Sequence, residues 1–213
     1  MLMSPKSGSL QKGGKESCPT KPELAELINR AFALGATDVA VVASDKIHVD
    51  ERLARICKKP GCPFYGVSAS CPPSVGGPDF FRSHVLQCRF AIVLRIDVSM
   101  DDLYSSERIS IMKGLHEVVA GVELTAHSLG YIQSRAFAGG SCKELFCPMH
   151  PSCRYLTTGE GCRHPEKARP SMSGFGIDVG HLMKLANWPE KKIDSISGTK
   201  KTDSWIAGLI LIG

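Results

Sequence analysis

Cysteines are concentrated in two short stretches of this sequence, and this concentration limits what the chain can fold into. Sulfur atoms gathered in a loop are held together by a metal or by disulfides. Seven of the nine cysteines lie in residues 57–71 and 142–162. They are Cys57, Cys62 and Cys71 in the first stretch, and Cys142, Cys147, Cys153 and Cys162 in the second. The pattern favours two metal-binding loops, with the rest of the chain as their scaffold.

The composition fits one folded domain in a reducing compartment. A chain of 213 residues that is 43% hydrophobic can bury a core without disulfides. Residues 1–19 are rich in Gly, Ser and Lys, which predicts a flexible tail before a single domain at 20–213. No secretory signal is visible, and the apolar run at 205–212 is too short to span a bilayer. We therefore expect a cytoplasmic protein without a membrane partner, in which reduced thiols serve as metal ligands.

The net charge of +5 does not indicate nucleic-acid binding. The excess positive charge is concentrated near the two ends of the chain. No basic stripe with interleaved aromatic residues follows a predicted helix, so we expect no nucleic-acid partner.

Hydrophobic periodicity predicts a mixed fold. Thr20 and Glu23 form a capping box before the first helix, and Ser99 and Asp102 are expected to form another before a long helix. Helices are expected at 22–34, 78–87, 102–129 and 177–188, and strands at 38–43, 90–98, 131–137 and 205–211. This order predicts an α/β or α+β fold, with a central sheet and flanking helices in one domain. Because each cysteine loop is expected to follow a strand, both are expected near one edge of the sheet.

Two glycines interrupt the predicted long helix. Gly114 and Gly121 each weaken a helix by about 1 kcal/mol relative to alanine. We expect close packing against a neighbouring element to compensate for this loss.

The second cysteine loop supplies four ligands, which is the number required by a [4Fe–4S] cluster or by zinc in a four-thiolate site. Two features favour iron–sulfur. Proline follows Cys62, Cys71 and Cys147, as it follows a cluster cysteine in bacterial ferredoxins. Neither loop contains the Cys-x2-Cys pair that is typical of zinc modules. Zinc stays the alternative metal.

The first loop supplies only three cysteines, so its fourth ligand is open. Cys88, Cys18, a histidine or an exogenous molecule could fill the position. Cys88 lies between a predicted helix and a strong predicted strand, where a buried structural cysteine is the simpler explanation. An unfilled position would let a substrate bind to the cluster, and the protein would then be an enzyme.

A dense polar run follows Cys162. Arg163 and Arg169 are candidates for binding a cofactor or another anionic ligand near the cluster. The alternative is that this run caps the next helix and is solvated, as charged loop residues usually are. His150 and His164 are expected to be loop residues or hydrogen-bond donors, because four cysteines already complete the second site.

The two cysteine loops together resemble a known family. The shared motif consists of Cys57, Cys62, Pro63, Tyr65, Gly66, Cys71, Pro72 and Pro73, followed by Cys142, Cys147, Cys153, Cys162, Arg163, His164, Pro165, Glu166, Arg169, Pro170, Ser171, Met172, Gly176, Ile177, Asp178 and Val179. From Thr37 to the C-terminus, the chain resembles cysteine-rich predicted metal-binding proteins of unknown function, which occur in methanogens and other anaerobes. The resemblance implies metal binding of the iron–sulfur kind in an anaerobic setting, and it implies no particular reaction.

Three functions are consistent with these patterns. The first is a redox protein with one or two [4Fe–4S] clusters, which transfers electrons to a redox partner protein or activates a partner enzyme. The second is a scaffold or interaction protein whose loops are held by structural zinc. The third is an enzyme with an open cluster at the three-cysteine loop. The sequence leaves open whether the protein is an enzyme.

Overall fold

A four-stranded antiparallel sheet forms the centre of the part of the chain that the computed structural model describes, residues 19–58, 61–188 and 204–213. The strand order is β1-β2-β4-β3. The strands are β1 (Asp38–Ala43), β2 (Phe90–Val98), β3 (Arg135–Phe137) and β4 (Ser204–Ile212). This architecture confirms the predicted mixed fold with a central sheet. Cys18 and nearly all of the predicted tail lie outside the described residues.

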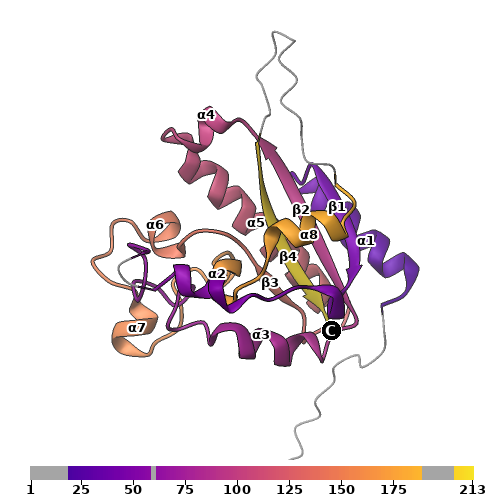
Figure 1. Cartoon of the computed structure of the whole chain (residues 1–213), viewed down its shortest axis with the longest axis horizontal. Helices are drawn as coiled ribbons and strands as arrows, with labels where there is room; N and C mark the ends of the chain where they lie inside the picture. The colour runs from indigo at the N-terminus through magenta and orange to yellow at the C-terminus, as the bar shows by residue number, and fades with distance from the viewer. Residues whose placement is uncertain (1–18, 59–60, 189–203) are drawn as a thin grey trace, which may run out of the picture.

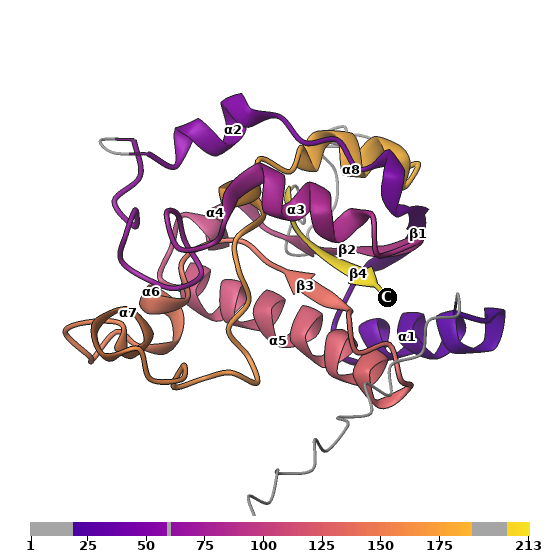
Figure 2. The ribbon, with the colours of Figure 1, turned by 90° about the horizontal axis from the view of Figure 1, so that it is seen from below.

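Helices cover both faces of the sheet (Figures 1 and 2). One face carries α1 (Lys21–Ala33) and α5 (Glu107–Ser128), and the other carries α2 (Glu51–Ile56), α3 (Gly77–Val85) and α8 (Val179–Leu185). Shorter elements are η1 (Ser44–Lys46), α4 (Met100–Leu103), α6 (Cys142–Phe146), α7 (Arg154–Thr158) and η2 (Met172–Phe175). Among the described residues, no helix is both long enough and apolar enough to pass through a membrane.

The central strands contribute to two separate cores. Along β2, Ile92 and Leu94 pack into the core beneath α1 and α5, while Ala91 and Val93 pack into the core beneath α3 and α8. Successive side chains of a strand point to opposite faces, so a strand covered on both sides must be apolar at nearly every position. This requirement explains the continuous apolar runs of β2 and β4, which made both strands predictable.

Several predicted boundaries are confirmed. The capping box of Thr20 and Glu23 is present before α1, and Gly35 follows this helix with a φ of 110°. The prediction of strands at 38–43 and 90–98 matches β1 and β2.

Other boundaries were wrong. The hydroxyl of Ser99 caps the separate short helix α4, by accepting a hydrogen bond from Asp101 N, and the long helix begins only at Glu107. The strand predicted at 131–137 is shortened to β3, because Tyr131 to Ser134 form a turn. The helix predicted at 177–188 is shortened to α8. The first cysteine loop follows α2 and not a strand, because Asp50 caps a short helix directly before the loop.

Glycine allows two close contacts of α5, one with the end of α1 and one with β4. A Cβ atom on Gly121 of α5 would overlap the side chain of Leu34, and one on Gly208 of β4 would overlap Val119 of α5. A Cβ on Gly114 would meet no atom within 4 Å. The expected close packing is therefore found at Gly121 and not at Gly114.

These contacts predict opposite effects for two alanine substitutions. Gly208→Ala should lower the free energy of unfolding by about 1–3 kcal/mol, because the added methyl group overpacks the contact between β4 and α5. Gly114→Ala should raise it by up to about 1 kcal/mol, because helix propensity improves without a clash. Urea unfolding followed by circular dichroism measures both values. A Gly208→Ala protein as stable as the parent would contradict the close contact.

Candidate metal centre

The first cysteine loop begins at the end of α2 and is built from successive turns. Cys57 is the C-cap of α2. Tyr65 N donates to Cys62 O at 3.2 Å, and Gly66 N reaches across the loop to Pro72 O at 2.7 Å. These bonds fold residues 62–72 back on themselves. As a result Cys57 and Cys62 are half-buried, while Cys71 is buried.

The second cysteine loop carries two short helices at one end of the sheet (Figures 1 and 2). Cys142 begins α6, Cys147 caps its C-terminal end and Cys153 precedes α7. Cys142 is buried, and Cys147, Cys153 and Cys162 are half-buried. Three of the four cysteines therefore lie at an end of a short helix, and Cys162 follows α7 by four residues. None of the cysteines in the described residues forms a disulfide.

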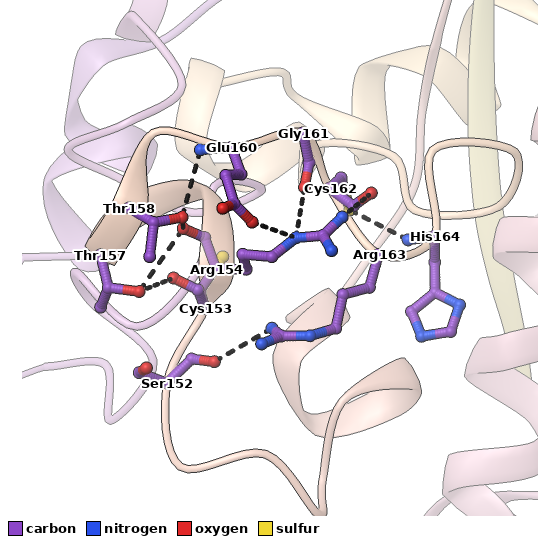
Figure 3. A network of polar contacts seen from close by, with 10 residues as sticks. All are labelled: Ser152, Cys153, Arg154, Thr157, Thr158, Glu160, Gly161, Cys162, Arg163 and His164. Atoms are coloured by element: carbon purple, nitrogen blue, oxygen red, sulfur yellow. Dashed lines mark hydrogen bonds and ion pairs between the residues drawn. The ribbon is translucent and has the colours of Figure 1, made fainter.

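Arg154 closes the last part of the second loop (Figure 3). Its guanidinium donates to Gly161 O at 2.8 Å and to Cys162 O at 3.2 Å, and it forms an ion pair with Glu160 at 3.6 Å. The backbone N–H of His164 donates to Cys162 Sγ at 3.4 Å. A backbone amide directed at a cysteine sulfur is one of the contacts by which proteins tune metal–thiolate sites.

Buried serine hydroxyls join the two cysteine loops. Ser68 Oγ lies 3.0 Å from Ser70 Oγ and 3.2 Å from Ser141 Oγ. Ser70 Oγ also accepts a hydrogen bond from Cys142 N at 3.2 Å. It lies 3.9 Å from the sulfur of Cys71, the next residue in the chain. We call Ser68, Ser70 and Ser141 the serine junction; it brings the buried cysteines of the two loops together.

The pKa values of two thiols show that cysteines from both loops are close neighbours. Burial raises the pKa of Cys57, and the thiolates of Cys62 and Cys71 raise it further. Burial likewise raises the pKa of Cys142 against the lowering effect of hydrogen bonds from Ser70 and Ser68, and the thiolates of Cys162 and Cys71 add to the rise. Cys71 thus influences a thiol in each loop, and the mutual repulsion is the kind that a bound cation removes.

The thiols are near one another but are not arranged around one point. Across residues 19–58, 61–188 and 204–213, no three side chains of His, Cys, Asp or Glu are close enough together to hold one metal ion. The donor chemistry fits a thiophilic metal, since free thiols from two loops share one buried junction. Coordination would require these loops to close further.

Cys88 lies apart from this group. It belongs to the core beneath α3 and α8, and burial raises the pKa of its thiol to about 11 without a contribution from another cysteine. Ser44 Oγ donates to its carbonyl oxygen. These surroundings are those of a structural core cysteine, so the fourth ligand of the first loop remains open.

The two predicted cofactor-binding arginines occupy different environments. Arg163 extends from the surface of the second loop and donates to Ser152 O at 3.4 Å (Figure 3). Arg169 is buried, pairs with Glu123 of α5 at 2.5 Å and donates to Pro165 O and Ala168 O at 2.9 Å. A role of either arginine in cofactor binding stays a prediction.

Sequence reasoning missed the groups that hold the second loop to α5. Glu123 Oε1 accepts from Ala136 N at 2.6 Å, in β3, while its other oxygen pairs with Arg169. His116 Nδ1 accepts from Arg169 N at 3.1 Å, which leaves Nε2 to donate to Gly139 O at 2.9 Å. The available signal in the sequence was that His116 and Glu123 lie among the apolar positions of the long helix α5.

Removing the charge of Glu123 should destabilise the protein strongly. Glu123→Gln keeps the acceptor for Ala136 N but leaves the Arg169 guanidinium buried without a counter-charge, at a cost of about 3–5 kcal/mol. The double variant Glu123→Gln/Arg169→Met should recover part of this loss, because it removes the unpaired charge. Urea unfolding of the three proteins measures the effect. A Glu123→Gln protein of parental stability would show that the pair is not needed.

His116 should make stability depend on pH. Burial lowers its pKa to about 4, so the unfolded chain binds a proton below about pH 6.5 that the folded protein resists. The contribution of neutral His116 to the free energy of unfolding is complete above pH 6.5. This contribution should fall by about 3 kcal/mol as the pH drops to 4. His116→Gln should abolish this part of the slope in urea unfolding. The other titratable groups contribute equally in both proteins, so equal slopes would contradict the assignment.

A family model supports the prediction that the chain binds metal. It covers residues 40–212 and is described as predicted metal-binding protein (DUF2284). No curated protein and no solved structure shows a significant match to the chain. The matched region includes both cysteine loops and the serine junction. The chain therefore belongs to this family of predicted metal-binding proteins.

Proposed function

We propose that the protein carries one or two [4Fe–4S] clusters on its cysteine loops and uses them to transfer electrons or to activate a partner enzyme in anaerobic metabolism. The observation that carries the proposal is the serine junction, which places Cys71 and Cys142 side by side although they come from different loops. Iron–sulfur is favoured over zinc by the prolines after Cys62, Cys71 and Cys147, and by the absence of a Cys-x2-Cys pair in the sequence.

The protein groups around the cysteines suit a cluster. His164 N already donates to Cys162 Sγ, and Ser70 Oγ lies near Cys71 Sγ. Hydrogen bonds to sulfur are among the contacts that set cluster potentials, and a bound cluster supplies one-electron chemistry. Cys147, Cys153 and Cys162 are half-exposed, so a redox partner protein can approach the second loop from solvent. We place Arg163 at the same surface as a residue that contacts an anionic group.

Two other functions have specific support. A structural zinc site would need the same thiols and would hold the two loops without redox chemistry. An enzyme with an open cluster is supported by the first loop, which brings only Cys57, Cys62 and Cys71 together, and by the separate core environment of Cys88. The identity of the metal distinguishes the iron–sulfur redox protein from the zinc scaffold. Binding of a small ligand to the metal distinguishes the enzyme with an open cluster from both.

Metal analysis of anaerobically purified protein tests the proposal. We expect iron and acid-labile sulfide in equal amounts, broad visible absorbance and an EPR signal after reduction. Colourless protein with stoichiometric zinc and no sulfide would instead establish the zinc scaffold. A reduced EPR spectrum that a small ligand changes would support an open iron in the first loop.

Single cysteine variants test how the two loops share metal. If each loop holds its own cluster, Cys71→Ala and Cys142→Ala should each remove about half of the iron, because a [4Fe–4S] cluster needs all its thiolates. If both residues serve one shared cluster, each variant should remove all of it. Cys18→Ala is the control and should retain the full iron content. Full iron in both Cys71→Ala and Cys142→Ala would contradict the ligand assignment.

A further inference from the structure

A cavity of about 440 Å³ lies beside the first cysteine loop. It is bounded by α2, by the residues on either side of Cys71 and by the beginning of α3. Figure 2 shows α2 and α3 on the same side of the sheet, connected at their left ends by the first loop. Cavities of this size commonly hold small molecules in proteins.

The charged groups around the cavity do not cancel. Its two carboxylates, Glu51 and Asp79, both pair with Arg82, at 3.4 and 2.7 Å. Arg55 and Lys58 also line the cavity, and neither forms an ion pair within the described part of the chain. Arg82 offsets only one of the two negative charges, but Arg55 and Lys58 bring the net charge of these five side chains to +1, which gives the cavity a positive potential.

The beginning of α3 adds to this potential. Gly76 is the N-cap of this nine-residue helix and supplies no side-chain cap for the amide groups of the first turn. A Cβ on Gly77 would meet no atom within 4 Å, which leaves open space in front of the helix. The positive end of the helix dipole and these amides attract negative charge.

The remaining wall of the cavity is apolar. Pro72, Pro73, Val75 and Ala54 contribute hydrocarbon surface, and Tyr65 adds an aromatic ring with a hydroxyl. A site that combines cations with hydrocarbon surface suits an organic anion better than a bare inorganic ion.

Arg55 and Lys58 flank Cys57 in the sequence. Both side chains are exposed and line the cavity, so their charge is available to a ligand there.

We propose that this cavity binds a small organic anion, whose carboxylate or phosphate group is held by Arg55 and Lys58 and whose hydrocarbon part lies against Pro72, Pro73 and Val75. This site goes beyond the proposed metal function and does not depend on which metal the cysteines bind. Its position next to Cys57 and Cys71 puts a bound anion beside the three-cysteine loop.

Isothermal titration calorimetry tests the site on the full-length protein as purified. The probes are benzoate, succinate and inorganic phosphate, with benzamide as the neutral counterpart of benzoate. We expect at least one organic anion to bind, and to bind at least tenfold more tightly than benzamide. Arg55→Gln and Lys58→Gln should each lower the affinity for that anion at least tenfold.

Arg52→Gln is the matched control, because Arg52 lies on the same helix, is exposed and pairs with Asp50 outside the cavity. It should leave anion affinity unchanged. The proposal is overturned if no anion binds, if benzamide binds as tightly as benzoate, or if Arg52→Gln weakens binding as much as the other two variants. Iron, zinc and sulfide are measured on the same samples, so failure of the anion site is distinguished from failure of the cluster proposal.

Discussion

The arrangement of the candidate site depends on three buried hydroxyl groups that satisfy one another. Ser68, Ser70 and Ser141 are almost completely inaccessible to solvent, and a buried hydroxyl without a partner costs about 1–3 kcal/mol. Moving one loop away from the other would leave several such groups unpaired at once. The junction therefore holds two segments that lie 72 residues apart in the sequence as one structural unit. The crowding of thiols follows from this contact.

The sheet and α5 together hold the base of the second cysteine loop in position. After β3, Ala138 N donates to Pro170 O, and Met172 N donates to Ala138 O, so the two ends of the second loop are joined at its base. Arg169, at this base, pairs with Glu123 of α5. The loop can carry irregular, cysteine-rich sequence because its ends are held by buried ionic and backbone contacts. These contacts at the ends of the loop explain how a site without regular structure keeps a defined position.

Periodicity and capping residues predicted the scaffold, because each element of it obeys a local rule. The apolar run of β2 reflects burial on both faces, and Thr20 with Glu23 marks a helix start by chemistry within four residues. The junction follows no such rule. Ser68 and Ser141 resemble any loop serine until the fold brings them within 3.2 Å. Arg169 sits in a polar run that is typical of solvated loops, and only the tertiary structure shows that it is buried.

Burial and neighbouring thiolates control the protonation of the thiols in the cysteine loops. Burial and neighbouring thiolates raise the pKa values of Cys57 and Cys142, so the thiols keep their protons at neutral pH in the absence of a cation. A bound metal must displace those protons, and its affinity must therefore rise with pH. The unpaired cations Arg55 and Lys58 lie beside this group but face the cavity. A metal bound at these thiols would neutralise them, and the positive charge of Arg55 and Lys58 would remain available to an anion from solution.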